Sequence, residues 1–179
     1  MKKGKVKMKI LILNGSPRTD GNTAAMAEAF KKGAESAGSE VTVINVAKKK
    51  IAGCLACEYC HTKGDGACVQ NDDMQEVYPH LAEADAVVIA SPIYYFNITG
   101  QMQCAISRFY APMKPAKATK AALLLSSGSP GVYKGAMAQF EDMTAFMGIE
   151  NAGIITACGD ENKSEDKLAE CEELGKSFA

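Results

Sequence analysis

The sequence predicts an α/β domain in which helices cover both faces of a doubly wound parallel sheet. Five short apolar segments alternate with helical patterns from one end of the chain to the other, an alternation typical of parallel sheets. The chain has 179 residues, of which 47% are hydrophobic and 23% charged, as expected for one globular domain. Because crossovers between parallel strands are right-handed, the three-layer arrangement follows.

The first expected strand is residues 8–13, an apolar run closed by the turn Asn14–Pro17, which is typical of a buried parallel strand. Asn22 or Thr23 is the expected N-cap of the first helix, and Gly38 its end. The remaining strands are expected at 41–46, 86–90, 121–125 and 152–157. The helices are expected at 24–37, 72–83, 99–110, from after 131 to 147, and 161–178.

The composition excludes several classes of protein. Lys and Arg number 20 against 21 for Asp and Glu, a net charge of −1, which excludes a strongly basic nucleic-acid binder. The apolar run at 10–13 is too short for a signal core or a membrane span. We expect a cytoplasmic protein with reduced thiols and no membrane partner. Residues 1–7 are the expected disordered lead, and residues 8–179 the single domain, with a cysteine-rich loop at 47–72.

A doubly wound sheet binds its ligand beyond the carboxyl ends of its strands. The loop after the first strand, residues 14–23, leads into a helix amino terminus, which favours a phosphate. Ser16, Asn22 and Thr23 add side-chain donors, and Arg18 adds a charged fork. Neither the dinucleotide fingerprint nor the Walker loop is present, so one terminal monophosphate is expected. The alternative is an ordinary strand–helix turn.

Two segments carry a family resemblance. Ser16-Pro17-Arg18 with Gly21-Asn22-Thr23, and the run Ser91–Gln101, resemble NAD(P)H-dependent FMN reductases of the flavodoxin-like superfamily. The resemblance extends through Arg108. It implies a flavodoxin-like fold with five parallel strands in the order 2-1-3-4-5. It also implies FMN as cofactor, with its phosphate in the first loop and its ring against the loops at 91–97 and 126–133.

The loop at 91–97 has the chemistry that a flavin ring needs. It combines aromatic and β-branched side chains with backbone N–H groups that are free if the loop is extended. The alternative is that the aromatic residues belong to the core. In the loop at 126–133, the resemblance places two small residues near the flavin. The ring contacts expected from both loops are Pro92, Ile93, Tyr94, Tyr95, Phe96, Asn97, Ser127 and Gly128.

Seven cysteines cannot all pair internally, and four of them lie within 15 residues. Cys54, Cys57, Cys60 and Cys68 have the spacing C-x2-C-x2-C-x7-C, which suits a [4Fe–4S] cluster and resembles iron–sulfur flavoproteins. Zinc and free thiols remain the alternatives. The other three, Cys104, Cys158 and Cys171, are expected to be packing residues.

The resulting hypothesis is an FMN-dependent oxidoreductase. Electrons pass from NAD(P)H, a transient co-substrate, through FMN to a small acceptor such as a quinone, flavin, azo or nitro compound. The flavin carries the chemistry, so no catalytic side chain is expected. The resemblance implies a homodimer or homotetramer. The alternatives are an iron–sulfur flavoprotein that passes single electrons to a protein partner, a flavodoxin-type carrier, and a redox sensor without flavin.

Overall fold

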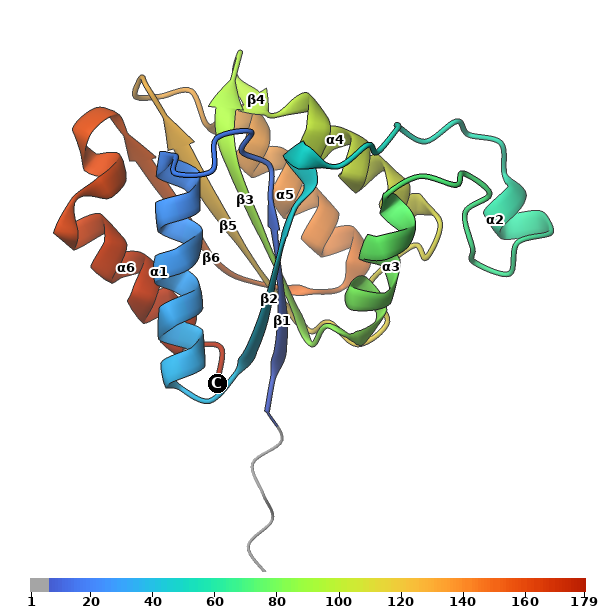
Figure 1. The fold of residues 1–179 in the computed structure, drawn as a ribbon, viewed down its shortest axis with the longest axis horizontal. Coiled ribbons are helices and arrows are strands. Elements are labelled where there is room, and N and C mark those ends of the chain that lie inside the picture. Colours follow the sequence, from blue (N-terminus) through green and yellow to red (C-terminus); the bar gives the residue numbers. More distant parts are fainter. Residues whose placement is uncertain (1–6) are drawn as a thin grey trace, which may run out of the picture.

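The computed structural model describes residues 7–179, so most of the expected lead lies outside the described residues. Five parallel strands form the central sheet in the order β2-β1-β3-β5-β6 (Figure 1). Counted among the long strands alone, this is the order 2-1-3-4-5 that was expected. The strands are β1 (Lys9–Asn14), β2 (Glu40–Asn45), β3 (Ala86–Tyr94), β5 (Lys120–Ser127) and β6 (Glu150–Cys158).

Helices cover both faces of the sheet, which confirms the three-layer prediction (Figure 1). On one face lie α1 (Asn22–Ser36) and α6 (Glu165–Lys176). On the other lie α3 (Met74–Glu83), α4 (Gly100–Ser107) and α5 (Lys134–Met147). The short elements are η1 (Val46–Lys48), α2 (Tyr59–Thr62), η2 (Arg108–Tyr110) and η3 (Gly159–Lys163).

Alternate residues of the central strands β1, β3 and β5 enter opposite cores. In β1, Leu11 and Leu13 pack with α3, α4 and α5, whereas Ile10 and Ile12 pack with α1 and α6. A strand buried on both faces has no polar side, which explains why the strands read as continuous apolar runs. Within residues 7–179, no helix combines the length and the apolar character needed to cross a membrane.

Two glycines bring α1 and α6 into close contact. A Cβ atom on Gly33 would lie 1.9 Å from the carbonyl oxygen of Glu172, and one on Gly175 would lie 2.1 Å from that of Phe30. Backbone atoms cannot move aside as a flexible side chain can, so the glycines set the distance between the helices. This contact holds α1 with its amino terminus at the carboxyl edge of the sheet (Figure 1).

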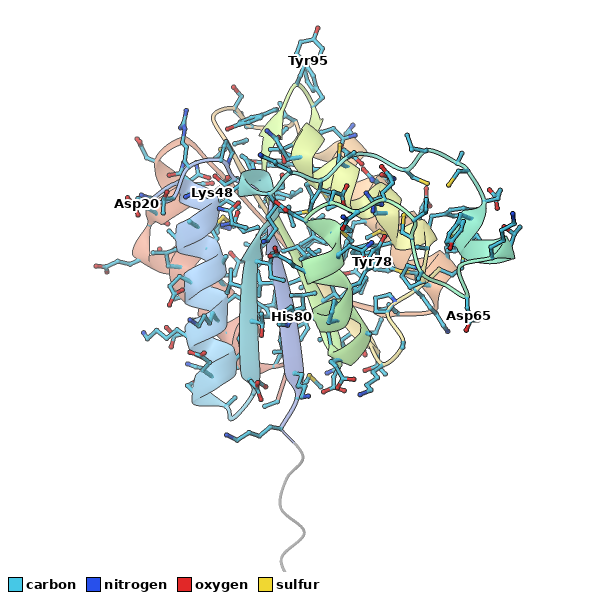
Figure 2. The ribbon with its side chains drawn as sticks, turned by 45° about the vertical axis from the view of Figure 1, so that its right-hand side comes forward. Asp20, Lys48, Asp65, Tyr78, His80 and Tyr95 are labelled. Atoms are coloured by element: carbon cyan, nitrogen blue, oxygen red, sulfur yellow. The ribbon has the colours of Figure 1, made fainter. Side chains whose placement is uncertain are left out.

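The segment expected to be a loop at 91–97 is instead mostly strand. β3 runs to Tyr94 and turns back into the two-residue strand β4 (Asn97–Ile98), with Tyr94 paired to Asn97. Tyr95 and Phe96 form the turn, and both have positive φ, 51° and 69°. Such turns usually carry Asn-Gly, and the absence of that signal hid the hairpin. Figure 2 shows Tyr95 at the tip, pointing away from the sheet.

Candidate functional site

The loops that follow β1, β3, β5 and β6 surround a pocket of about 200 Å³ at the carboxyl edge of the sheet, hereafter the edge pocket. This is where a doubly wound sheet binds its ligand. All but three of the residues predicted to hold the cofactor line it. The lining residues among them are Ser16, Arg18, Asn22, Thr23, Pro92, Ile93, Tyr94, Ser127 and Gly128.

The amino terminus of α1 opens onto the edge pocket without a side-chain cap. Its N-cap is Gly21, not the expected Asn22 or Thr23, and no side chain in residues 7–179 caps its first turn. The preceding loop is held by its own bonds, since the N–H of Ser16 donates to Asn14 Oδ1 (2.9 Å) and that of Arg18 to Ser16 Oγ (3.2 Å). The helix N–H groups beside Arg18 therefore suit a phosphate.

Hydroxyl groups link the loops across the edge pocket. The side-chain oxygens of Thr23 and Ser126 lie 2.6 Å apart, so Thr23 links the start of α1 to the end of β5 rather than capping its helix. Ser127 Oγ donates to the carbonyl of Ser129 (2.7 Å) and lies 2.6 Å from the hydroxyl of Tyr133. Burial raises the pKa of Tyr133, although the bond with Ser127 opposes this. These bonds fix the pocket wall without a ligand.

Asn162, which the sequence reasoning missed, also lines the edge pocket. It lies on η3, is buried, and donates through Nδ2 to the carbonyls of Ser127 and Gly159, each at 2.8 Å. Its Oδ1 is buried, and the described part of the chain offers it no hydrogen-bond partner. An unsatisfied buried acceptor costs about 1–3 kcal/mol, so this oxygen suits a ligand donor. The signal was its place after the fifth long strand, at the same sheet edge.

Three predicted ring contacts do not line the edge pocket. Tyr95 is 97% exposed and Phe96 is 64% exposed, both at the hairpin tip. Asn97 is turned back on its own backbone, with Oδ1 accepting from the N–H of Ile98 (2.8 Å). The hairpin also uses N–H groups that the sequence reasoning left free for a flavin. The direct contribution of this segment to the pocket is Pro92, Ile93 and Tyr94.

The predicted cysteine ligands all line a second pocket, hereafter the cysteine pocket, between η2 and the cysteine loop. This loop projects from the sheet beyond α3 (Figure 1). In Figure 2, Asp65 marks the outer end of this loop. Cys60 is buried, and Cys68 is partly buried. In residues 7–179, no three side chains of His, Cys, Asp or Glu are gathered around a single-ion position. Cys54 and Cys57 are exposed.

The backbone of the cysteine loop has the features of a cluster-binding loop. Ala56 and Glu58 both have positive φ, 51° and 57°, and left-handed residues in a turn can bring N–H groups to one side, where they can face an anion. One such group, the N–H of Ala56, donates to Cys54 Sγ at 3.4 Å. Left-handed non-glycine residues cost about 1–3 kcal/mol each. A four-iron cluster spreads its thiolates over separate irons, so these residues fit a cluster better than one ion.

The two ends of the cysteine loop meet at Asp72, Ala52 and Arg108, hereafter the neck. Asp72 Oδ2 accepts from the N–H of Ala52 (3.0 Å) and from Arg108 Nη1 (2.7 Å), and its Oδ1 accepts from the N–H of Met74 (3.1 Å). Arg108 Nη1 also donates to the carbonyl of Ala52 (3.0 Å). Burial raises the pKa of Asp72, but the hydrogen bonds from Arg108, Ala52 and Met74 together outweigh burial, so the pKa is lowered.

The three cysteines outside the loop differ in environment. Cys171 is fully buried beside α1, and burial raises its pKa to about 12. Such a thiol is a small hydrophobic residue rather than a nucleophile. Cys104 and Cys158 are partly buried.

Comparison with known proteins agrees with this geometry. An iron–sulfur flavoprotein of Archaeoglobus fulgidus is 45% identical over 101 residues, which are 56% of this chain and 45% of that protein. A putative NAD(P)H-dependent FMN-containing oxidoreductase of Bacillus subtilis, YwqN, is 26% identical over 178 residues and 93% of both chains. The chain spans about half the length of the iron–sulfur flavoproteins it matches.

The fold has solved counterparts. The NAD(P)H:quinone oxidoreductase from Methanothermobacter marburgensis superposes with a TM-score of 0.74 at 16% identity, covering 96% of each chain. At that identity the likeness concerns the fold alone, and it confirms the flavodoxin-like architecture. Residues 8–158 match the family described as NADPH-dependent FMN reductase. This chain is therefore a member of the NADPH-dependent FMN reductase family of oxidoreductases.

Proposed function

We propose that the protein is an NAD(P)H-dependent FMN oxidoreductase that binds FMN in the edge pocket and reduces a small acceptor. The observation that carries this is the uncapped amino terminus of α1 beside Arg18, within a pocket formed at the carboxyl edge of the sheet. When bound, FMN supplies hydride acceptance and electron transfer. Acceptors of the expected class are quinones, flavins, and azo or nitro compounds.

Different residues of the edge pocket bind different parts of FMN in this proposal. The α1 N–H groups and Arg18 hold the phosphate. Asn162 Oδ1, buried and without a partner in residues 7–179, accepts from a hydroxyl or N–H of the cofactor. Pro92 to Tyr94 lie against the ring, and Gly128, where a Cβ would meet nothing within 4 Å, lets the backbone approach it.

We further propose that a second copy of the chain covers the exposed hairpin tip. Tyr95 and Phe96 are exposed at the hairpin tip and do not line their own edge pocket. A homodimer or homotetramer, as the family resemblance implies, would cover them. Size-exclusion chromatography with light scattering tests this part: a monomer at working concentration contradicts it.

The phosphate assignment is tested by FMN binding. The full chain, purified without oxygen, should show flavin absorbance near about 375 and 450 nm. Arg18→Ala removes a charge-assisted hydrogen bond of about 1.5–3 kcal/mol, so the Kd for FMN should rise roughly 10- to 150-fold. The matched control is Lys48→Ala, which removes a cation that bonds Thr19 outside the pocket lining. A colourless protein that takes up no added FMN contradicts the proposal.

A second candidate function is that of an iron–sulfur flavoprotein, with a [4Fe–4S] cluster on Cys54, Cys57, Cys60 and Cys68. The convergence of these four residues on one pocket favours it, and zinc or free thiols are the alternatives. Iron and sulfide analysis decides between them. Cys57→Ser should remove iron and leave flavin, whereas the control Cys158→Ser, outside the loop, should keep both.

A further inference from the structure

Arg108 has more hydrogen-bonding capacity than its protein partners use. Its side chain is 1% exposed, and Nη1 alone makes the bonds of the neck. Nε and Nη2 are buried and have no partner among the described residues. Buried donors on a charged group are costly when unpaired, by more than the 1–3 kcal/mol typical of neutral groups. The bonds of the neck therefore do not explain why Nε and Nη2 are buried.

Arg108 lines the cysteine pocket together with the four cysteines, so its remaining donors have this pocket beside them. Of the described residues lining this pocket, Arg108 is the cation and Glu58 the anion. Glu58 is held by the hydroxyl of Tyr110 at 2.9 Å.

A positive charge at this position has a definite electrostatic effect. A four-iron cluster on four thiolates is anionic, and adding one electron adds one negative charge without making or breaking a bond. The reduction potential depends on the net charge and on hydrogen bonds to the sulfurs. A guanidinium in a buried site stabilises the more negative, reduced form more than the oxidised form. It therefore raises the potential.

We propose that Arg108 is the positioning residue and charge partner of the cluster site, with Nη1 closing the neck and Nε and Nη2 donating to the cluster or its cysteine sulfurs. This rests on the proposed four-cysteine cluster. The two roles are separable, because Asp72 takes part in the neck but does not line the cysteine pocket. Asp72→Asn weakens the neck and keeps the guanidinium, whereas Arg108→Gln removes the charge.

The test uses the full chain with FMN, reconstituted anaerobically with ferrous iron and sulfide. Wild type, Arg108→Gln, Arg108→Lys and Asp72→Asn are compared for iron and sulfide per chain, FMN content and cluster midpoint potential. Arg108→Gln should lower the equilibrium constant for cluster reduction at least tenfold, which is 59 mV for one electron. Arg108→Lys keeps the positive charge but not the several N–H donors of the guanidinium, so its midpoint potential should lie between those of wild type and Arg108→Gln. Asp72→Asn, which removes a negative charge, should leave the potential unchanged or raise it.

Failure of this proposal is distinguishable from failure of the cluster. Wild type that takes up no iron and sulfide overturns the cluster and this inference together. Wild type with a cluster, and Arg108→Gln with the same iron content and potential, overturns the role of Arg108 alone. If Arg108→Gln does not fold, as judged by FMN binding and circular dichroism, the double variant D72N/R108Q leaves no buried carboxylate unpaired. The iron content and midpoint potential of D72N/R108Q and of Arg108→Lys then decide the role of Arg108 by the same criteria.

Discussion

Asp72 fixes the neck of the cysteine loop, and Asp72→Ala should destabilise the protein strongly. The substitution removes three hydrogen bonds and leaves Arg108, 1% exposed, with the carbonyl of Ala52 as its remaining acceptor among the described residues. The neighbouring Asp73 provides a matched control, because its carboxylate also accepts from the opposite side of the loop, the N–H of Lys50 at 2.7 Å, but contacts no buried cation.

The size of the effect follows from burial. Removing one partner of a buried ion pair costs about 3–5 kcal/mol, because the other charge stays buried. For 179 residues, an unfolding entropy of about 2.1 cal/mol/K per residue gives about 0.38 kcal/mol/K, so Tm should fall by about 8–13 °C. Asp73→Ala loses one hydrogen bond, about 0.5–1.5 kcal/mol, and Tm should fall by about 1–4 °C.

Thermal unfolding of the apo chain, followed by circular dichroism, measures both values, and urea unfolding checks them at constant temperature. A fall in the free energy of unfolding below about 1 kcal/mol for Asp72→Ala, or an equal fall for Asp73→Ala, would refute the reasoning. Either result would place the pair in the class of exposed salt bridges. The neck would then not be what holds the loop against α4.

Three further predictions concern packing, the cofactor and pH. Gly33→Ala puts a Cβ against backbone and should cost about 1–3 kcal/mol or more in urea unfolding, while Gly100→Ala, which meets nothing within 4 Å, should be neutral. Asn162→Ala removes the unpaired Oδ1 and should raise the Kd for FMN about tenfold or more in a fluorescence titration; an unchanged Kd contradicts its placement against FMN. Because the pKa of Asp72 is below its ordinary 3.8, its stabilisation is complete above that pH and disappears as pH falls through the lowered pKa. The stability difference between wild type and Asp72→Ala should therefore shrink on acidification below about pH 4, and a constant difference down to pH 2 would contradict the assignment.

The layers and strand order were predictable because they depend on periodicity and handedness. Each buried strand reads as an apolar run, and the crossover rule then leaves few topologies. Ser16, Arg18, Asn22 and Thr23 line the edge pocket, since the loop after the first strand of such a sheet lies at that edge. Their roles in binding FMN remain predictions.

The errors arose where tertiary context overrides local signals. Tyr95 and Phe96 adopt positive φ in a two-residue turn, although neither residue type favours it, so propensity predicted a loop. Thr23 has the residue type of a cap but bonds instead to Ser126, which lies 103 residues further along the chain at the end of β5. Asn162 belongs to no recognisable motif, and its position after the fifth long strand was the available signal. Asn162 is a candidate ligand contact because its buried Oδ1 has no hydrogen-bond partner among the described residues. That observation requires the three-dimensional structure.

Helix α4 physically connects the two sites. At its amino end the hydroxyl of Thr99 donates to the carbonyl of Gly15 (2.9 Å), beside the edge pocket. At its carboxyl end Ser107 Oγ accepts from the N–H of Cys54 (3.1 Å), and Arg108 holds the neck. Eight helical residues span about 12 Å. Because a hydrogen-bonded helix sets this spacing, the separation between the flavin-side and cysteine-side anchors is fixed within one chain. A variant that loosens the neck should therefore alter the cysteine site without changing FMN affinity.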